Sequence, residues 1–393
     1  MYFKSRTPVR RIAFAIPVAL LAWTQPCLAQ IHVPADYPTI QAAVDAATSG
    51  MTITVAAGQY EEQVRIVGKD LTLEGLPGAT LVSPAALDLV EIGPMVAGRR
   101  PVLAAAGCQL DIRGFAFDGL RRGAEMERFT GVLYVSSGGT VENCSFTGFR
   151  EQSAGPLPFT PDPERAFQLA NGSGVVPIAV RSCTFTDNAG AIFVSGRPNV
   201  DPNSLRALCN IADNVVVGLG PQPFLAQNGI WLSAGARGTI QGNHVSGHQY
   251  LGSDNFSIGI LTGDTGLSPG FVMQRVLVLG NTTVHNTIGI ASIFSNKNLI
   301  HHNDVIGGTF GFSGIAVSGQ GSTLLQNSIG MGQSVVSGNS GVLLLGAEFD
   351  AGFGSGFATD TSVLFNTIAG AVRPIWSQTG VTGTTEIGNA ILP

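Results

Sequence analysis

A six-residue segment that recurs from residue 112 onward constrains the fold more than any other feature of the chain. Its first position is almost always Val, Ile or Leu, its fourth is usually Cys or Asn, and its sixth is Phe, Val, Ile or Thr. Successive fourth positions are 22 to 39 residues apart. The copies span residues 112–117, 141–146, 180–185, 211–216, 240–245, 278–283, 300–305, 324–329 and 363–368, with a partial copy at 386–391.

A unit this short cannot bury its own apolar side chains. Most copies follow a second strand-like motif, such as "GVLYVS" (131–136) or "GIWLSA" (229–234), so each unit contains two or three short strands. The 52 glycines fit many tight turns between such strands. Stacking the units in parallel register buries their apolar faces together, as in solenoid proteins. The repeat therefore predicts an all-β fold, a right-handed parallel β-helix.

The fourth position of the repeat predicts a column of stacked polar side chains. Asn tolerates the left-handed conformation at a turn, and its amide can bond to the equivalent Asn one coil away. In two earlier copies Cys144 and Cys183 occupy this column. We favour a buried stack of thiols there over a disulfide, because parallel stacking keeps the Cβ atoms farther apart than a relaxed disulfide requires. The column continues through Asn214, Asn243, Asn281, Asn303, Asn327, Asn366 and Asn389.

Residues 1–29 have the composition of a secretory signal peptide, with a basic start, an apolar run and a small residue before the expected cleavage site. They contain four of the 21 basic residues and none of the 26 acidic ones, so the rest of the chain carries a net charge of −9. This charge disfavours nucleic acid as a partner, and no later apolar run is long enough to predict a membrane span. We expect a secreted or periplasmic protein, with residues 30–393 forming a single β-helix domain.

The start of that domain differs from the repeat. In "VPADYPTIQAAVDAATSGMTITVAAGQYEEQVRI" (33–66), Pro38, four apolar residues at helical spacing and Gly50 predict a short helix. Such a helix would cover the open end of the solenoid, whose strand edges would otherwise be exposed. We assign the cap and first coil to residues 30–82 and the repeat coils, with loop insertions, to residues 83–393.

This segment, followed by "LTLEGL" (71–76), resembles the N-terminal cap of pectin-lyase-like β-helix proteins, which include pectin methylesterases. The resemblance implies that polysaccharide, often acidic, is the ligand. The segment "ENCSFTGFREQS" (142–153) also resembles a pectin methylesterase motif, but Arg150-Glu151 stands where that family has Gln-Asp. A second aspartate motif of the family has no counterpart near residues 188–196. Lyase-type and esterase-type processing of a polyuronate therefore both stay open.

Charge and long loops point to one region of the solenoid. Residues 118–166 contain 12 charged residues, whereas residues 277–393 contain seven. Insertions at 119–129 and 150–174 lie on consecutive coils, and an aromatic loop follows at 247–257. Because long loops on a rigid scaffold commonly carry binding and catalytic groups, we place the site here. The catalytic candidates are Glu151, Arg150 and Arg128, and the substrate-binding candidates are Arg121, Arg122, Glu125, Asp162, Arg165, His248, Tyr250 and Asp254.

The histidine pair in "NLIHHNDVIGG" (298–308) resembles a metal site but fits the repeat frame. His301 falls in a solvent-facing column and His302 at the corner, so we expect the two side chains to diverge. We accordingly predict no metal, no cofactor and a monomer. The main alternative to an enzyme is a non-catalytic carbohydrate-binding or surface protein, since no complete catalytic set is evident. A metal-handling β-helix protein is a third, weaker hypothesis.

Overall fold

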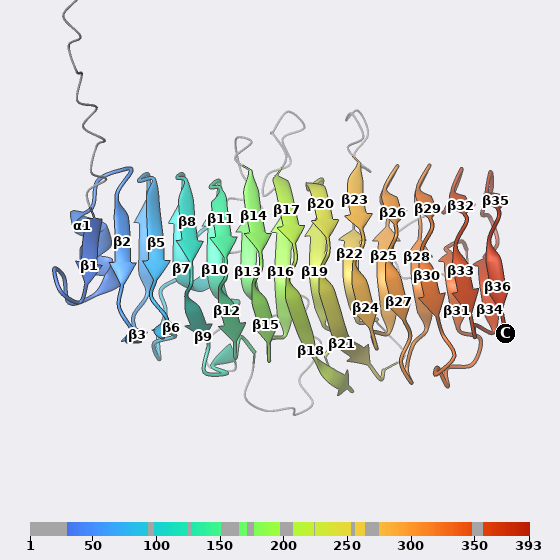
Figure 1. The fold of residues 1–393 in the computed structure, drawn as a ribbon, viewed down its shortest axis with the longest axis horizontal. Coiled ribbons are helices and arrows are strands. Elements are labelled where there is room, and N and C mark those ends of the chain that lie inside the picture. The colour runs from blue at the N-terminus through green and yellow to red at the C-terminus, as the bar shows by residue number, and fades with distance from the viewer. Residues whose placement is uncertain are drawn as a thin grey trace, which may run out of the picture.

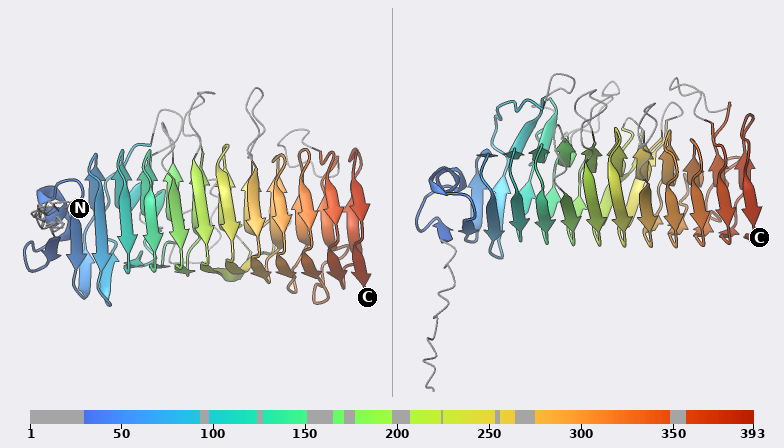
Figure 2. Two further views of the ribbon diagram at one scale, coloured as in Figure 1. Left: turned by 45° about the horizontal axis from the view of Figure 1, so that its top comes forward. Right: turned by 90° about the horizontal axis from the view of Figure 1, so that it is seen from above.

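The computed structural model describes residues 30–92, 98–123, 127–150, 165–170, 177–196, 207–223, 225–252, 256–263, 275–347 and 357–393. The chain winds into a straight row of coils, and its strands form three long parallel sheets (Figures 1 and 2). A typical coil contributes one strand to each sheet in turn. The parallel β-helix predicted from the repeat is confirmed, and its coils contain three strands each.

The three sheets are named A, B and C in the order in which the chain visits them. Sheet A consists of β1 (Gln30–Val33), β2 (Thr52–Val55), β5 (Leu71–Gly75), β8 (Leu110–Arg113), β11 (Gly139–Glu142), β14 (Ile178–Arg181), β17 (Leu208–Ala212), β20 (Arg237–Gln241), β23 (Val276–Leu279), β26 (Leu299–His301), β29 (Thr323–Leu325), β32 (Ser362–Leu364) and β35 (Thr385–Ile387). Sheet B consists of β3 (Gly58–Glu61), β6 (Ala79–Val82), β9 (Ala116–Asp118), β12 (Ser145–Thr147), β15 (Thr184–Thr186), β18 (Val215–Gln222), β21 (His244–Tyr250), β24 (Thr282–Val284), β27 (Asp304–Ile306), β30 (Ser328–Gly330), β33 (Thr367–Ala369) and β36 (Ala390–Leu392). Sheet C consists of β4 (Val64–Val67), β7 (Arg100–Ala106), β10 (Phe129–Val135), β13 (Arg165–Ala170), β16 (Gly190–Ser195), β19 (Asn228–Ser233), β22 (Ile258–Gly263), β25 (Ile288–Ile293), β28 (Ser313–Val317), β31 (Ser340–Leu344) and β34 (Arg373–Ser377).

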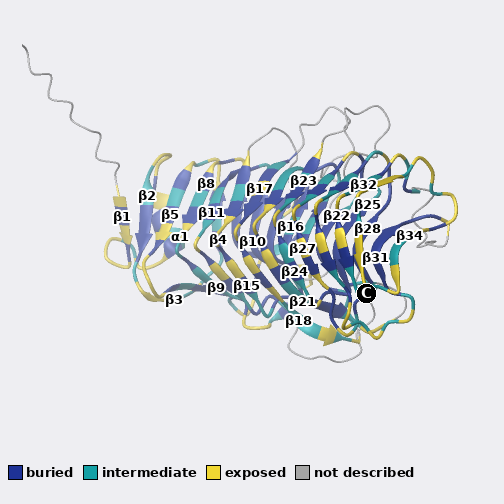
Figure 3. Cartoon of the chain, turned by 45° about the vertical axis from the view of Figure 1, so that its right-hand side comes forward, coloured by how far each residue is buried: buried dark blue, intermediate teal, exposed yellow. Residues whose placement is uncertain are grey.

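The core runs along the axis of the solenoid. The first position of the repeat lies in sheet A and the sixth in sheet B, and both point inward, as for Val141 and Phe146. Equivalent side chains stack along the axis, and the rings of Phe117, Phe146 and Phe185 lie 4.8 and 4.7 Å apart and nearly parallel. In Figure 3 buried and more exposed residues alternate along strands of sheets A and B, as the two-residue period of a strand requires. Several strands of sheet C are instead buried along their whole length.

The turn from sheet A to sheet B contains the predicted amide ladder. Asn243 Nδ2 donates to Asn281 Oδ1 at 2.9 Å, and Asn281 Nδ2 donates to Asn303 Oδ1 at 3.0 Å. The backbone N–H of each also donates to the next amide oxygen. The pattern is unbroken from Asn214 to Asn389. Buried amides that lacked such partners would destabilise the fold, so the ladder fixes the register of each coil on the next.

The predicted left-handed conformation occurs one residue earlier than expected. The residue at the third position has positive φ, for example Asp213 at 55° and Gln326 at 52°, whereas the ladder asparagines do not. Our assignment of the left-handed conformation to the asparagines was therefore wrong. The third residue makes the sharp turn, and this turn directs the following Asn side chain inward, where its amide reaches the neighbouring coil.

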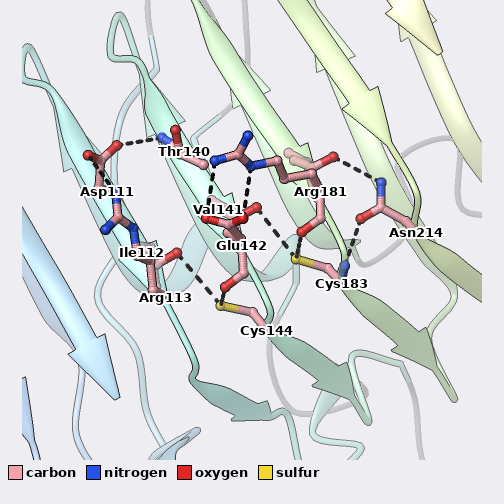
Figure 4. A network of polar contacts seen from close by, with 11 residues as sticks. Asp111, Ile112, Arg113, Thr140, Val141, Glu142, Cys144, Arg181, Cys183 and Asn214 are labelled. Atoms are coloured by element: carbon pink, nitrogen blue, oxygen red, sulfur yellow. Dashed lines mark hydrogen bonds and ion pairs between the residues drawn. The ribbon is translucent and has the colours of Figure 1, made fainter. Parts of the chain in front are cut away.

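Cysteines replace asparagine in the two coils that precede Asn214. Cys144 and Cys183 are buried free thiols, as are Cys108 and Cys209, so the interpretation as a thiol stack is confirmed. The backbone N–H of Cys183 donates to Asn214 Oδ1 at 3.0 Å, which joins the thiols to the ladder (Figure 4). The neighbouring Cys144 thiol and burial both raise the pKa of Cys183.

A single short helix covers the N-terminal end of the described solenoid (Figure 1). Helix α1 (Ile40–Ala46) buries Ile40, Ala43 and Val44 against the first coils. The Glu62 carboxylate accepts hydrogen bonds from the first two helical N–H groups, and Lys69 Nζ donates to carbonyl oxygens at the last turn. Opposite charges at the two ends complement the helix dipole. The capping helix is confirmed, and no helix of the described residues is long and apolar enough to cross a membrane.

The two predicted insertions begin just after consecutive strands of sheet B, β9 and β12. The segments that connect β9 to β10 and β12 to β13 lie at the corner between sheets B and C, hereafter the B–C corner. The segment predicted as one insertion, 150–174, is interrupted by β13, a full strand of sheet C. The prediction was wrong because "RAFQLA" has no polar-apolar alternation. Its residues are buried on both faces of the sheet.

We expect Asn281→Ala to destabilise the fold by about 2–4 kcal/mol, because it removes the bonds to the amide side chains on both sides and leaves buried groups on both neighbouring coils without partners. Urea unfolding measures this change. Asn389→Ala is the matched control, since Asn389 ends the ladder and is half-exposed. Equal losses for the two variants would contradict a ladder whose contribution depends on burial.

Candidate functional site

The B–C corner brings together two of the predicted arginines around one carboxylate. Counted from the inward phenylalanine that ends each repeat, Arg121 and Arg150 both lie four residues later, in consecutive coils. Asp187 lies two residues after the equivalent phenylalanine of the third coil. Because the coils stack in register, these three side chains meet at one edge of the solenoid.

The Asp187 carboxylate binds both guanidinium groups at once. Arg150 Nε donates to Asp187 Oδ1 at 2.5 Å, and Arg121 Nε donates to Asp187 Oδ2 at 2.7 Å. The Arg121 side chain is 51 % exposed, whereas those of Arg150 and Asp187 are 20 % and 25 % exposed. Each oxygen of Asp187 is therefore occupied by an arginine, and the carboxylate holds the two cations in fixed positions.

Three residues of this corner have a left-handed backbone conformation. Leu120 and Arg121 both have positive φ, 52° and 56°, and Asp187 has a φ of 59°. A left-handed non-glycine residue costs about 1–2 kcal/mol. Hydrogen bonds from Leu120 N to Asp118 Oδ1 and from Arg121 N to Gly148 O, both 2.9 Å, hold the turn in place.

A pocket of about 280 Å³ opens beside this cluster. Arg150 and Asp187 form one wall, and Gly218, Leu219 and Gln222 form the other. The second wall exists because β18 and β21 extend beyond the neighbouring strands of sheet B (Figure 1).

Glutamine side chains hold this second wall. Gln227 Oε1 accepts a hydrogen bond from Leu219 N at 2.7 Å, and Gln222 Nε2 donates to Leu219 O at 3.1 Å. Gln227 is fully buried and also donates to Gly220 O at 2.8 Å. The pocket is therefore built on a fixed backbone.

Tyr250 lies one coil beyond Gln222 along the B–C corner. It pairs in register with Gln222 on the neighbouring strand, and its side chain is half-buried. From the coil of Arg121 to that of Tyr250 the corner spans four strand spacings, roughly 19 Å at about 4.8 Å each. The corner thus presents an extended row of polar and aromatic groups.

Other predicted arginines lie away from the pocket. Arg122 Nη1 donates to Glu61 Oε1 at 3.3 Å and to Ser83 O at 2.9 Å, so it joins its coil to the two coils before it. Arg128 is exposed just before β10 and has a φ of 58°. Arg165 is buried on the outer face of sheet C, with its guanidinium 3.6 Å from the centre of the Phe193 ring.

His248 lies inside the coil. It is 3 % exposed, and its Nδ1 lies 3.2 Å from Asn286 Oδ1. Burial lowers its pKa to about 4, so it is neutral at neutral pH. The remaining predicted residues, Glu151, Glu125, Asp162 and Asp254, lie outside the described residues.

The histidine pair does not diverge as predicted. The rings of His301 and His302 lie 3.9 Å apart, because the left-handed backbone of His302 (φ 53°) turns its side chain back over its neighbour. His301 Nε2 lies 3.0 Å from Gln326 Oε1. Over the described ranges, no three His, Cys, Asp or Glu side chains come close enough to share a metal ion.

Asp187 and Gln222 were not among the residues predicted for the site. A signal for Asp187 was available, because the repeat frame continues past its sixth position: "DGLR" (118–121), "TGFR" (147–150) and "TDNA" (186–189) align column by column. Gln222 had no comparable signal, since its place depends on the extension of β18 and on a register shift between Val217 and Gly220.

The buried His248 makes stability depend on pH. Its pKa falls from 6.5 to about 4 on folding, so the unfolded chain binds more protons between these values. Stability is therefore lost as pH falls from 6.5 towards 4. We expect the wild type to lose about 2–3 kcal/mol more than His248→Gln between pH 7.5 and 4.5, measured by urea unfolding. Equal losses would show that His248 does not carry this dependence.

Comparison with known proteins identifies the architecture. The family described as a right-handed β-helix region matches residues 130–329, which is half of the chain. No curated protein sequence matches the chain.

Solved structures show the same fold at low sequence identity. The A-module of the mannuronan C-5 epimerase of Azotobacter vinelandii is 15 % identical over 90 % of each chain, with a TM-score of 0.57. A double mutant of a periplasmic alginate epimerase is 15 % identical, covers 86 % of this chain and 77 % of its own, and has a TM-score of 0.52. A mannuronic acid specific polysaccharide family 6 lyase from human gut microbiota is 14 % identical, covers 92 % and 82 %, and also has a TM-score of 0.52. The sequence match and the fold agree, and the chain belongs to the right-handed β-helix family.

Proposed function

We propose that this protein binds acidic polysaccharide along the B–C corner and processes polyuronate chains there. The observation that carries the proposal is the pair of arginines fixed by Asp187 beside the pocket. Two cations and one carboxylate make a cationic point on a chain that is otherwise acidic. A uronate carboxylate is the ligand chemistry that this point fits.

Arg121 is the group best placed to bind such a carboxylate. Its Nε is engaged by Asp187, which leaves the two terminal nitrogens of a half-exposed guanidinium directed away from that contact. Terminal guanidinium nitrogens bind a carboxylate in a bidentate manner, and such charge-assisted pairs are stronger than neutral hydrogen bonds. Because Asp187 already restrains the side chain, binding costs little additional conformational entropy.

The length of the row favours a polymer over a small molecule. The corner from Arg121 through the pocket to Tyr250 is several sugar units long, and Tyr250 offers an aromatic ring at its far end. Three β-helix proteins of similar fold are named for mannuronan, alginate or mannuronic acid, which are uronic acid polymers or their unit. These names support a polyuronate as the ligand class.

Processing requires an acid or base that Asp187 is badly placed to supply, since both its oxygens accept hydrogen bonds from arginines. Elimination and epimerisation both begin when a base removes the proton next to the uronate carboxylate, and an arginine on that carboxylate stabilises the resulting charge. Ester hydrolysis needs a base to activate water. We assign the acid/base role to Glu151, which follows Arg150 directly, and keep Arg128 as a second cation.

A non-catalytic binding protein is the second candidate. Among the described residues that line the pocket, Asp187 is the only carboxylate, and it is occupied by arginines. Without a base at the site, the same corner would hold a polyuronate without changing it. The two candidates share the binding step and differ only in products.

Arg121→Gln should weaken binding of polygalacturonate or polymannuronate at least about tenfold, because a charge-assisted pair contributes about 1.5–3 kcal/mol. Titration calorimetry at low salt measures this, and rising salt should weaken wild-type binding. Arg181→Gln is the matched control, since Arg181 pairs with Glu142 on the outer face of sheet A (Figure 4). An equal loss of affinity in both variants would indicate that binding depends on the overall charge of the protein and not on the B–C corner.

Glu151→Gln should abolish turnover while binding and fold persist. The protein is incubated with pectins, alginates and neutral glucans. Assays for reducing ends, unsaturated uronate, released methanol and uronate epimers then detect each reaction class. Unchanged turnover in the variant would remove Glu151 from the mechanism. Binding by the wild type without any product would favour the non-catalytic protein.

A further inference from the structure

We infer that Glu386 keeps a second copy of this chain from stacking on the C-terminal end of the described solenoid. The inference does not depend on the proposed function. It rests on the last partial copy of the repeat, "EIGNAI" (386–391), which has a glutamate at the first position, where the other copies have Val, Ile or Leu. The register of sheet A shows where that side chain lies.

Three strands form an open rim at this end of the structure. Among the described residues, β34, β35 and β36 each end their sheet, and each pairs with a strand of the preceding coil on one side only (Figure 1). Apolar side chains lie at this rim, since Ile387, Ile391 and Leu392 are 53 %, 49 % and 50 % exposed. Unpaired strand edges that carry apolar side chains favour association between copies of a chain.

Glu386 occupies a column that is otherwise apolar and buried. It pairs in register with Val363 on β32, which points into the core. The equivalent residues from β2 to β32 are at most 1 % exposed, and they are Ile53, Leu73, Ile112, Val141, Val180, Ile211, Ile240, Val278, Ile300, Leu324 and Val363. Within the described coils, a charged residue therefore enters this column at the open end and nowhere else.

The glutamate is solvated in this position. Glu386 is exposed, and no described side chain forms an ion pair or a hydrogen bond with its carboxylate. The two other inward positions of the last coil keep the apolar pattern, because Ile375 follows Val342 and Ile391 follows Ile368 in register. The charge is therefore confined to one column, at a place where water still reaches it.

A second copy stacked on this end would enclose the carboxylate. Removing an unpaired carboxylate from water costs far more free energy than removing an apolar or a neutral polar group. In a two-fold contact between identical ends, both copies would contribute Glu386 to one dry core, where the two like charges would also repel each other. A valine in the same place would instead continue the apolar column from one copy into the other.

The opposite end of the solenoid does not offer an equivalent surface. Helix α1 covers the first coils there and buries Ile40, Ala43 and Val44 against them. Contact between the open end of one copy and the N-terminal end of another is therefore blocked by the helix. The occupant that Glu386 excludes is the open end of a second copy, and the assembly that it prevents is a tail-to-tail dimer.

Glu386→Val should create this dimer and leave the fold intact, since Glu386 is exposed. We expect sedimentation velocity, over about a hundredfold range of concentration, to show self-association at least about a hundred times tighter than in the wild type. Species larger than a dimer should not form, because a tail-to-tail contact is closed. Thr385→Val is the matched control, since it replaces a hydroxyl with a methyl on the same exposed strand outside the core column. It should sediment as the wild type does.

Two further variants separate the core position from overall charge and locate the contact. Glu386→Lys changes the net charge more than Glu386→Val does, but it still places a charge in the column, so it should stay dissociated. Ile391→Asp added to Glu386→Val puts a new charge into the same end of the core and should dissociate the dimer again.

Four results would overturn the inference. Self-association of Glu386→Val no tighter than that of the wild type would show that the carboxylate excludes nothing. Equal association of Glu386→Lys and Glu386→Val would show that overall charge explains the effect. Association that survives the added Ile391→Asp would place the contact elsewhere on the molecule, and species larger than a dimer would contradict the tail-to-tail geometry.

Discussion

The buried amide ladder from Asn214 to Asn389 is the interaction on which the rest of the structure depends. Each asparagine donates to and accepts from its equivalents in adjacent coils, and a slip of one residue would leave amides buried without partners. Hydrophobic stacking alone is less specific, since Val, Ile and Leu can exchange places with small changes in packing. The ladder therefore sets the register, and the register sets which side chains meet on the surface.

Because the coils stack in register, residues that occupy the same position of successive repeats lie side by side on the surface of the solenoid. Arg121 and Arg150 occupy one column of the B–C corner, so their guanidinium groups lie about one strand spacing apart. Two like charges this close would repel each other, and Asp187 in the third coil offsets that repulsion by binding both. The same geometry on sheet A produces the Glu142–Arg181 pair, which is a self-contained ion pair. The difference is that at the corner one carboxylate binds two arginines, and a pocket adjoins them.

The parts of the structure that could be predicted are those that repeat. The inward columns, the amide ladder and the thiol stack all follow from the two-residue period of a strand and the alignment of the copies. The left-handed residue was displaced by one position, because the pattern alone does not show which residue makes the turn. The buried strand β13 was read as a loop because it lacks alternation, which is the usual signal for a strand.

The sequence named some of the side chains that meet at the B–C corner and missed others. Arg121 and Arg150 were identified from charge and loop length, whereas Asp187 required the repeat frame to be carried past its last apolar position. His248 lies in a polar segment of the sequence, yet the extension of β21 takes it into the interior, where burial favours its neutral form.

A crystal structure of the protein with a bound uronate hexasaccharide tests the central claim most directly. We expect a uronate carboxylate within hydrogen-bond distance of the terminal nitrogens of Arg121, with the sugar chain lying across the pocket and the strands that follow it. A hexasaccharide bound to the outer face of sheet A or sheet B, with Arg121 and Arg150 still facing solvent, would contradict it.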